Sequence, residues 1–232
     1  ERVVDRAVAL GRSDAVQLSV LCLPALAHAL LPGAAARLLQ ACPHARLSVT
    51  PQESPLLEEW MSAQRFDLGL GEQTATPPGT QAEVLLTLDE VAVLPAGHAL
   101  AMRPVLGLDD FAGLPFVSLS ADDPYRRQID ALFAQAGVQR QLRLETHSAV
   151  AVCAMVQQGL GLAIVNPLTP LAMAGSGLVV RRLGFSVPFS INALLPLYRP
   201  ALPEAQPLLQ SLEAQAQEVT AALQRLLSQP AN

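Results

Sequence analysis

Short apolar runs alternate with helical patterns along most of the chain. The apolar runs predict β-strands at residues 16–22, 46–50, 68–71, 90–95, 115–119, 142–145, 162–165, 179–183 and 191–197. Apolar residues spaced three or four apart predict helices, the first of them bent or restarted at Pro32, at residues 24–42, 55–64, 124–136, 149–158, 167–174 and 204–227. This alternation is typical of an α/β fold with a mostly parallel sheet covered by helices on both faces.

The strand–helix pattern runs twice. Residues 14–95 give strand–helix–strand–helix–strand, and residues 115–166 begin the same series again. A segment rich in Gly and Pro, LPAGHALAMRP at residues 94–104, joins the two series. Two α/β units in succession predict two lobes with a cleft between them. The last helix has an apolar stripe that includes Leu208 and Leu212, so we expect it to return to the first lobe.

Four of the predicted helices start directly after a strand with the sequences CLPA, QESPL, ADDPY and THSA. Pro occupies the expected first helical position in three of them, and Ser54, Asp123 and Ser148 fall at or near the N-cap. Helix N-termini present free N–H groups and a partial positive charge, which favour anions such as carboxylates. Ordinary capping explains any one start, but four at strand ends of two lobes favour a ligand site in the cleft.

Charged side chains gather at the same turns. Glu53, Asp122 and Asp123 offer carboxylates to ammonium groups, and Arg126 offers a forked partner for a carboxylate. Both basic residues have an alternative to ligand binding. Arg126 fits a solvated residue one turn into a helix, and His147 fits a cap or surface residue. Asn166 either caps the next helix or points its carboxamide into the cleft.

Composition limits the classes of protein. The chain has 232 residues, 51% of them hydrophobic and 15% charged, which is enough for a large core. Its net charge of −5 argues against nucleic-acid binding by this segment alone. Three cysteines, Cys22, Cys42 and Cys153, lie in apolar runs without metal-ligand spacing, so we expect a reducing, cytoplasmic location. No apolar run is long enough to suggest a membrane span, and we expect no membrane partner.

No catalytic motif stands out. The sequence contains no GxSxG, HExxH or CxxC pattern, and Cys153 lies among Ala, Val and Met residues of a helix. The GLG at residues 159–161 follows a helix, so it fits a C-cap at Gly159 and a tight strand entry at Gly161 better than a dinucleotide site. We therefore expect no catalytic residues, no metal and no cofactor.

Several longer blocks resemble the effector-binding domain of LysR-type transcriptional regulators. The resemblance covers residues 14–200 and is carried by PQESPLLEEWMSAQRFDLGLGE, LDEVAVLPAGHAL, ETHSAVAVCAMVQQGLGLAIVNPLTP and SGLVVRRLGFSVPF. The stretches QESPLLEEW and ETHSA resemble the members that activate the diaminopimelate decarboxylase gene. The resemblance implies two Rossmann-like lobes with an interlobe cleft, similar to type 2 periplasmic binding proteins. Lobe one would comprise residues 14–95 plus 197–232, and lobe two residues 96–196.

The resemblance also implies partners. Members of the family carry a winged helix-turn-helix and a linker helix upstream, and residues 1–12, which open with Glu1 and show helical spacing, fit the end of that linker. DNA would be contacted only through that missing domain. Members self-associate as dimers, and as tetramers when full-length.

The resemblance places the effector, diaminopimelate or lysine, at the interlobe helix starts. With the neighbouring turn included, the predicted effector-binding residues are Pro24, Ala25, Glu53, Ser54, Ser118, Ser120, Asp122, Tyr125, Arg126, Thr146, His147, Ser148 and Asn166. Many members have Ser or Thr at the position of Leu23, so the first helix offers only backbone donors here. Two alternatives remain open, a solute-binding protein of an amino-acid transporter and an enzyme on the same lobes. The unpaired cysteines and the helix fragment at residues 1–12 count against the transporter protein.

Overall fold

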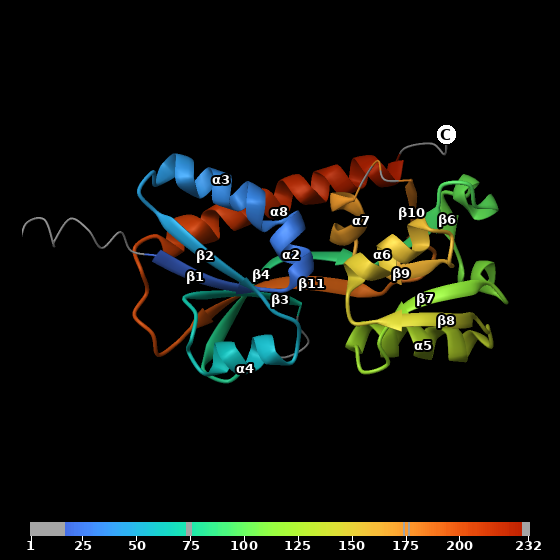
Figure 1. Cartoon of the computed structure of the whole chain (residues 1–232), viewed down its shortest axis with the longest axis horizontal. Helices are drawn as coiled ribbons and strands as arrows, with labels where there is room; N and C mark the ends of the chain where they lie inside the picture. Colours follow the sequence, from blue (N-terminus) through green and yellow to red (C-terminus); the bar gives the residue numbers. More distant parts are fainter. Residues whose placement is uncertain (1–16, 73–75, 174, 176, 229–232) are drawn as a thin grey trace, which may run out of the picture.

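The chain folds into two α/β lobes that lie side by side (Figure 1). A computed structural model of the protein describes residues 17–72, 76–173, 175 and 177–228. The predicted end of a linker helix at residues 1–12 lies outside this range. We call lobe one the five-stranded sheet with its helices, and lobe two the four-stranded sheet, a separate strand pair and their helices.

Lobe one is built on a sheet with the strand order β2-β1-β3-β11-β4. Its strands are β1 (Gln17–Cys22), β2 (Arg46–Pro51), β3 (Leu68–Glu72), β4 (Thr80–Asp89) and β11 (Pro188–Pro196). Its helices are α2 (Pro24–Ala29), α3 (Leu31–Ala41), α4 (Leu56–Ser62) and α8 (Ala205–Ser228). In Figure 1, α3 and α8 lie on one side of the sheet and α4 on the other. The predicted break in the first helix is confirmed, and it falls at Leu30.

Lobe two contains a sheet with the strand order β6-β10-β5-β9 and the parallel pair β7-β8. Its strands are β5 (Val91–Pro95), β6 (Val105–Leu106), β7 (Pro115–Leu119), β8 (Gln141–Thr146), β9 (Ala163–Val165) and β10 (Leu178–Leu183). Its helices are α5 (Pro124–Ala136), α6 (Ala149–Gln157) and α7 (Leu168–Ala172), with short 3-10 turns at Ala99–Met102 and Leu108–Phe111.

The chain crosses between the lobes twice. It leaves lobe one at Glu90, between β4 and β5, and returns between β10 and β11. The N–H of Glu90 donates to the carbonyl of Val187 at 2.9 Å, so the two crossings are hydrogen-bonded to each other. The predicted lobe boundaries at 95/96 and 196/197 each fall one strand later in the chain than the crossings. Strand β5 pairs with β9 and β10 and so belongs to lobe two. Strand β11 pairs with β3 and β4 and so belongs to lobe one.

The expectation of a mostly parallel sheet is wrong for the strands next to the crossings. β1 runs parallel to β2 and β3, but β11 runs antiparallel to β3 and β4, and β5 runs antiparallel to β9 and β10. The sequence pattern also fails to predict β4, because its sequence TQAEVLLTLD mixes exposed and buried positions without a regular alternation. A register shift at Ile191/Asn192 in the partner strand β11 accompanies this irregularity.

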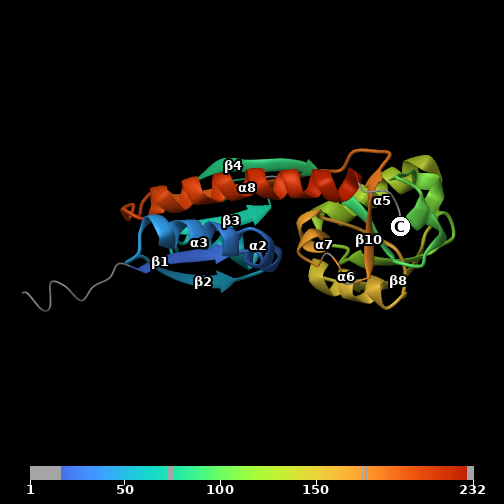
Figure 2. The same ribbon diagram turned by 90° about the horizontal axis from the view of Figure 1, so that it is seen from above.

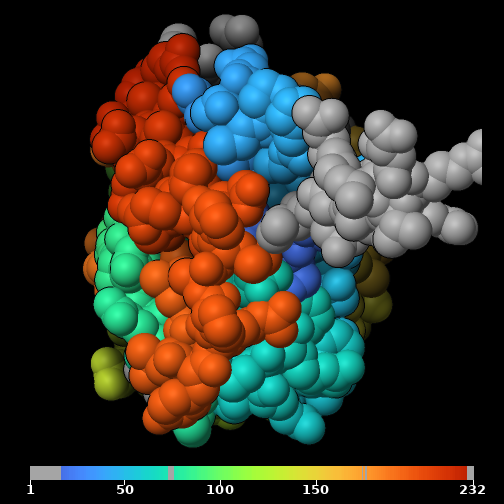
Figure 3. All heavy atoms as spheres, turned by 90° about the vertical axis from the view of Figure 1, so that its left-hand side faces the viewer, coloured from blue at the N-terminus to red at the C-terminus, as the bar shows by residue number. Residues whose placement is uncertain are grey.

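Helix α8 joins the lobes a third time. It packs on α3 and β4 of lobe one, as predicted for the last helix, and its C-terminal part also reaches α7 and β10 of lobe two (Figure 2). Leu226 and Leu227 there pack against the apolar core of lobe two. An ion pair between Arg37 and Glu218 ties α3 to α8, and Figure 3 shows the orange-red C-terminal part of the chain beside α3 at the end of lobe one.

Across the part of the chain that the structure describes, no helix has both the length and the hydropathy needed to cross a bilayer.

Two glycines of the GLG segment have different roles. Gly159 has a φ of +76°, which confirms the left-handed position expected after α6. Gly161 has no such φ, but a Cβ on it would lie 2.8 Å from the Pro115 carbonyl oxygen. The close approach arises because Leu162 donates to Pro115 at 2.9 Å and Val117 donates to Leu162 at 2.8 Å.

The substitution Gly161→Ala therefore forces β7 away from the segment that leads into β9. We expect it to lower the free energy of unfolding by about 1–3 kcal/mol, the usual effect of overpacking. Guanidinium unfolding measures this, with Gly97→Ala as a control because a Cβ at Gly97 meets nothing within 4 Å. Equal stability of the two variants would contradict the close approach.

Candidate functional site

A cavity of about 480 Å³ lies between the two lobes. Its volume is in the range of small-molecule sites. Both lobes line it, through Leu23, Pro24, Ala25, Glu53, Ser54, Pro55, Glu58, Glu72, Leu119, Asp122, Asp123, Pro124, Tyr125, His147, Ser148, Ala149, Val150 and Asn166. The starts of α2, α4, α5 and α6 all face it, each directly after a strand, which is the arrangement that the four helix starts in the sequence predict.

Most of the predicted effector-binding residues come together at this cavity. Those that line it are Pro24, Ala25, Glu53, Ser54, Asp122, Tyr125, His147, Ser148 and Asn166. Those that do not line it are Ser118, Ser120, Arg126 and Thr146.

The residues outside the lining support the turns around it. Ser118 is buried in β7, Ser120 donates its N–H to the carbonyl of Thr146 at 3.1 Å, and the Thr146 hydroxyl accepts from the N–H of Ser148 at 3.3 Å. Arg126 is 7% exposed. Its guanidinium donates to Asp130 at 2.8 Å and to the Leu119 carbonyl at 2.7 Å, so it holds α5 against β7.

The helix starts differ in how they are capped. Asp123 accepts from the N–H of Arg126 at 2.8 Å and Ser148 accepts from the N–H of Ala151 at 3.4 Å, which confirms both as N-caps. Ser54 is not a cap, because its hydroxyl donates to Glu58 at 2.7 Å and α4 begins after Pro55. Leu23 precedes α2 without a side-chain cap, in line with the missing hydroxyl at that position. Because α2 and α4 are short, α5 and α6 are the stronger helix dipoles at the cavity.

Asn166 has the first of the two roles that the sequence left open, the cap of the next helix. Its Oδ1 accepts from the N–H and from the hydroxyl of Thr169, each at 3.0 Å, and so caps the start of α7. The residue is 4% exposed and still lines the cavity. Its side-chain oxygen is therefore bonded to Thr169 and not free for a ligand.

Carboxylates dominate the electrostatics of the cavity. Glu53, Glu58 and Glu72 approach it from lobe one, and Asp122 and Asp123 from lobe two. His147 is the only basic side chain among the described residues that line it, and its Nδ1 lies 3.7 Å from Asp122 Oδ1. The cavity therefore favours a ligand with positive charge.

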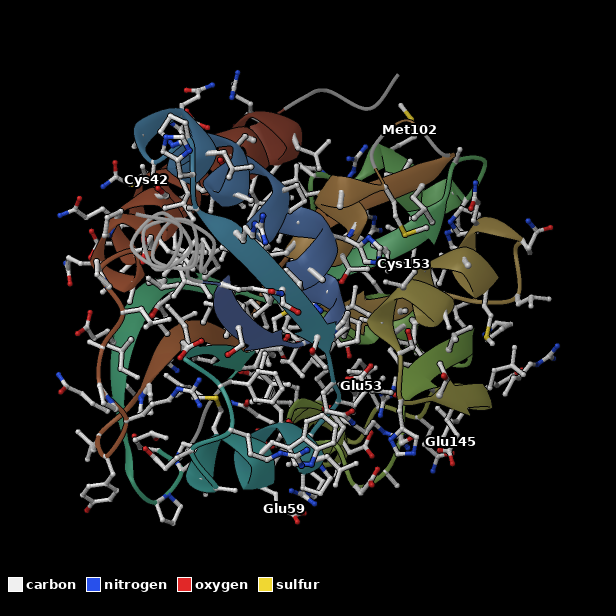
Figure 4. The ribbon with its side chains drawn as sticks, turned by 60° about the vertical axis from the view of Figure 1, so that its left-hand side comes forward. Cys42, Glu53, Glu59, Met102, Glu145 and Cys153 are labelled. Carbon is white, nitrogen blue, oxygen red and sulfur yellow. The ribbon has the colours of Figure 1, made fainter. Side chains whose placement is uncertain are left out.

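The pKa values of Glu53, Glu72 and Asp123 are raised. Burial and the neighbouring charges of Asp123, Glu53 and Glu58 raise the pKa of Glu72 to about 8. Burial raises the pKa of Glu53. The charge of His147 lowers this pKa, and the charge of Asp123 raises it further. Because Glu53 belongs to lobe one and Asp123 and His147 to lobe two, these groups act on each other across the cavity. Figure 4 shows Glu53 on the side of lobe one that faces lobe two, whereas Glu59 points away on the outer face of α4.

Sequence reasoning missed Glu58 and Glu72. Glu72 ends β3, so its place at the carboxyl end of a buried strand is the signal that would have identified it. Glu58 lies one turn into α4, and its contact with Ser54 depends on the conformation of the preceding loop, which the sequence pattern does not predict.

The described residues offer little for catalysis or metal binding. Within them, no group of three or more His, Cys, Asp or Glu side chains has an arrangement that could hold a metal ion. Burial raises the pKa of the Cys22 and Cys153 thiols to about 12, so neither is a thiolate nucleophile at neutral pH.

Comparisons with known proteins assign the chain to a family. The family model for the LysR substrate binding domain matches residues 11–217. The chain is 46% identical over 228 residues to the transcriptional activator protein LysR of Escherichia coli, an alignment that covers 98% of this chain and 73% of that protein.

Solved structures of regulators share the fold. HinK, a LysR family regulator of Pseudomonas aeruginosa, matches with a TM-score of 0.74 and 22% identity over 93% of this chain and 75% of its own. The regulatory domain of Synechocystis CcmR, determined in complex with 2-PG, matches with a TM-score of 0.73 and 17% identity over 85% of this chain and 96% of its own. The fold is thus the predicted type 2 periplasmic-binding-protein-like α/β architecture. The chain belongs to the LysR substrate-binding domain family and is the effector-binding domain of a LysR-type transcriptional regulator.

Proposed function

We propose that the interlobe cavity binds a small amino acid, meso-diaminopimelate or lysine, and that this binding switches transcription of a diaminopimelate decarboxylase gene. The observation that carries the proposal is the composition of the cavity wall, where carboxylates and helix starts from both lobes face one space of about 480 Å³. Diaminopimelate matches this wall because each of its ends carries an ammonium group and a carboxylate. Lysine matches it in part, because it has an ammonium group at each end and a carboxylate at one.

The wall favours one orientation of the effector. The N-terminus of α6, with Ala149 and Val150 at the cavity, has free backbone N–H groups for a carboxylate, and Ser148 and His147 lie beside it. Glu53, Glu58 and Glu72 stand on the lobe-one side and suit an ammonium group. An effector held in this way contacts both lobes.

The similarity to LysR supports the choice of effector and gene. The chain is 46% identical to that activator. The blocks QESPLLEEW and ETHSA, which carry the resemblance in the sequence, include Glu53, Ser54, Glu58, His147 and Ser148 of the cavity. Because the matching relatives are regulators, the proposal replaces the transporter protein and the enzyme that the sequence left open.

Binding would act by a shift between open and closed lobes. A ligand favours the closed state only by its higher affinity for that state. Lysine lacks one carboxylate of diaminopimelate. It would therefore make fewer contacts that bridge the N-terminus of α6 in lobe two and the carboxylates of lobe one, and would favour the closed state less. In the whole protein, a change in lobe arrangement would alter the packing of a dimer or tetramer in the cytoplasm and, through an upstream DNA-binding domain, the bend of the operator DNA.

Thermal unfolding of the domain tests the proposed effector. At a hundredfold excess over its Kd, meso-diaminopimelate is expected to raise Tm by about 5–10 °C, with a smaller rise for lysine. The substitution His147→Ala removes a group at the carboxylate end and should reduce the rise, whereas His44→Ala, an exposed site away from the cavity, should not. No rise with any diaminopimelate stereoisomer or lysine would contradict the proposal.

A further inference from the structure

Two buried carboxylate oxygens near the cavity have no hydrogen-bond partner. One is Glu90 Oε2, in a side chain whose residue is only 2% exposed. The other is Glu58 Oε2, whose companion oxygen accepts from Ser54 at 2.7 Å. A buried acceptor without a donor is costly, so such oxygens mark a place where a donor binds.

These carboxyls form one electrostatic group. The charge of Glu90 interacts with Glu72 and Asp123, and Glu72 interacts in turn with Glu53 and Glu58. Glu53, Glu58, Glu72 and Asp123 line the cavity, whereas Glu90 lies at the crossing behind it. Among the described lining residues His147 is the only basic one, and it acts on Glu53. The charges that act on Glu72 and Glu90 are all acidic, which leaves a cation from outside the chain as their candidate partner.

The titratable groups that act on Glu72 come from several elements. Asp123 and Tyr125 approach from the start of α5, Glu53 and Glu58 from the start of α4, and Glu90 from the crossing after β4. His147, from the turn before α6, acts on Glu53. The described side chains do not converge in a way that would hold a metal ion, which favours a hydrogen-bonding organic cation over a metal.

We propose that Glu72, with Glu53, Glu58 and Asp123 around it and Glu90 behind it, forms an ammonium subsite, and that an amine bound in the cavity displaces a proton held by the carboxyls that line it. The step is an exchange: the carboxyl releases its proton to solvent, and the carboxylate then accepts hydrogen bonds from the ligand's ammonium group. This proposal deepens the proposed function of the same cavity and rests on its being the effector site. Glu90, at the crossing, would sense this change of charge through its interaction with Glu72.

The ligand-free protein should show these protons in its stability. A carboxyl whose pKa is raised in the folded state stabilises the fold less as the pH rises from its unfolded value of 4.5 towards about 8. We therefore expect urea unfolding to give a lower free energy at pH 8 than at pH 6, and Glu72→Gln to reduce this loss. Asp67, whose pKa is lowered chiefly by hydrogen bonds from Ser19 and Arg199 despite its burial, titrates below this window and does not contribute.

The matched control for that measurement is Glu59→Gln, an exposed carboxyl on α4 outside the cavity. It should leave the difference between pH 6 and pH 8 as in the wild type. An equal loss of stability in the wild type and in Glu72→Gln would contradict the proton held at Glu72.

Calorimetric titration with five probes tests the subsite itself. L-Lysine is compared with L-norleucine, which lacks its side-chain ammonium group, and meso-diaminopimelate with 2-aminopimelate, which lacks one of its two. 1,5-Diaminopentane carries two ammonium groups and no carboxylate. Titrations at pH 6.5 in phosphate and in MOPS, two buffers of different ionisation enthalpy, measure the protons released.

We expect the diamino compounds to bind at least tenfold more tightly than their monoamino partners. Their affinity should rise by up to about tenfold per pH unit between pH 6 and pH 8, with release of up to about one proton. Glu72→Gln should reduce the affinity and weaken its dependence on pH, and Glu59→Gln should do neither.

The outcomes separate the two proposals. If diaminopentane binds with proton release but diaminopimelate and lysine do not bind, the subsite stands and the proposed effectors are wrong. If diaminopimelate binds without proton release and no more tightly than 2-aminopimelate, the effector stands and the subsite is overturned. If none of the three diamino compounds binds, the subsite is likewise overturned.

Discussion

The structure depends on the way the two lobes are joined. The chain passes between them twice, and the hydrogen bond from Glu90 to Val187 ties the two passages together. Because β5 and β11 each join the sheet of the lobe they enter, the carboxyl ends of β1, β2, β3, β7 and β8 face one shared space. The cavity is a consequence of this connection, since neither lobe encloses it alone.

The same connection limits how the lobes can move. Tyr125 at the start of α5 packs against Phe189 of β11, with ring centroids 5.7 Å apart. On another side, α2 packs on α7 and the end of α8 reaches lobe two. A change in the cavity therefore has to act through the crossing strands or by rotation about these contacts, which suits a small shift between two lobe arrangements.

The charges in the cavity oppose the stability of the ligand-free fold. Burying carboxylates beside one another without a cation raises their pKa values and keeps some of them protonated. Groups that are perturbed by burial and by like charges in a cleft are typical of functional sites. Under the proposed function, a cationic effector would relieve this repulsion, so binding and closure would draw on the same electrostatic energy.

The sequence predicts the parts of the fold that follow from local pattern. The strand at Pro115–Leu119 and the helix at Pro124–Ala136 agree with the prediction at both ends, because an apolar run, an Asp cap and a C-terminal Gly mark them. The caps at Asp123 and Ser148 and the cavity positions of Glu53 and His147 follow from the same local signals. The antiparallel crossing strands, the burial of Arg126 and the carboxyl group around Glu72 depend on contacts between distant segments, which no local pattern encodes.

In the proposed function, an amine-bearing effector draws the two lobes together around their shared cavity. The most direct test is a spin-label distance measurement across the cleft, with labels at Glu59→Cys on α4 and Gln128→Cys on α5, both exposed, and with Cys42 replaced. Saturating meso-diaminopimelate is predicted to shorten the distance between the labels and narrow its distribution. Identical distributions with and without bound diaminopimelate would contradict the account.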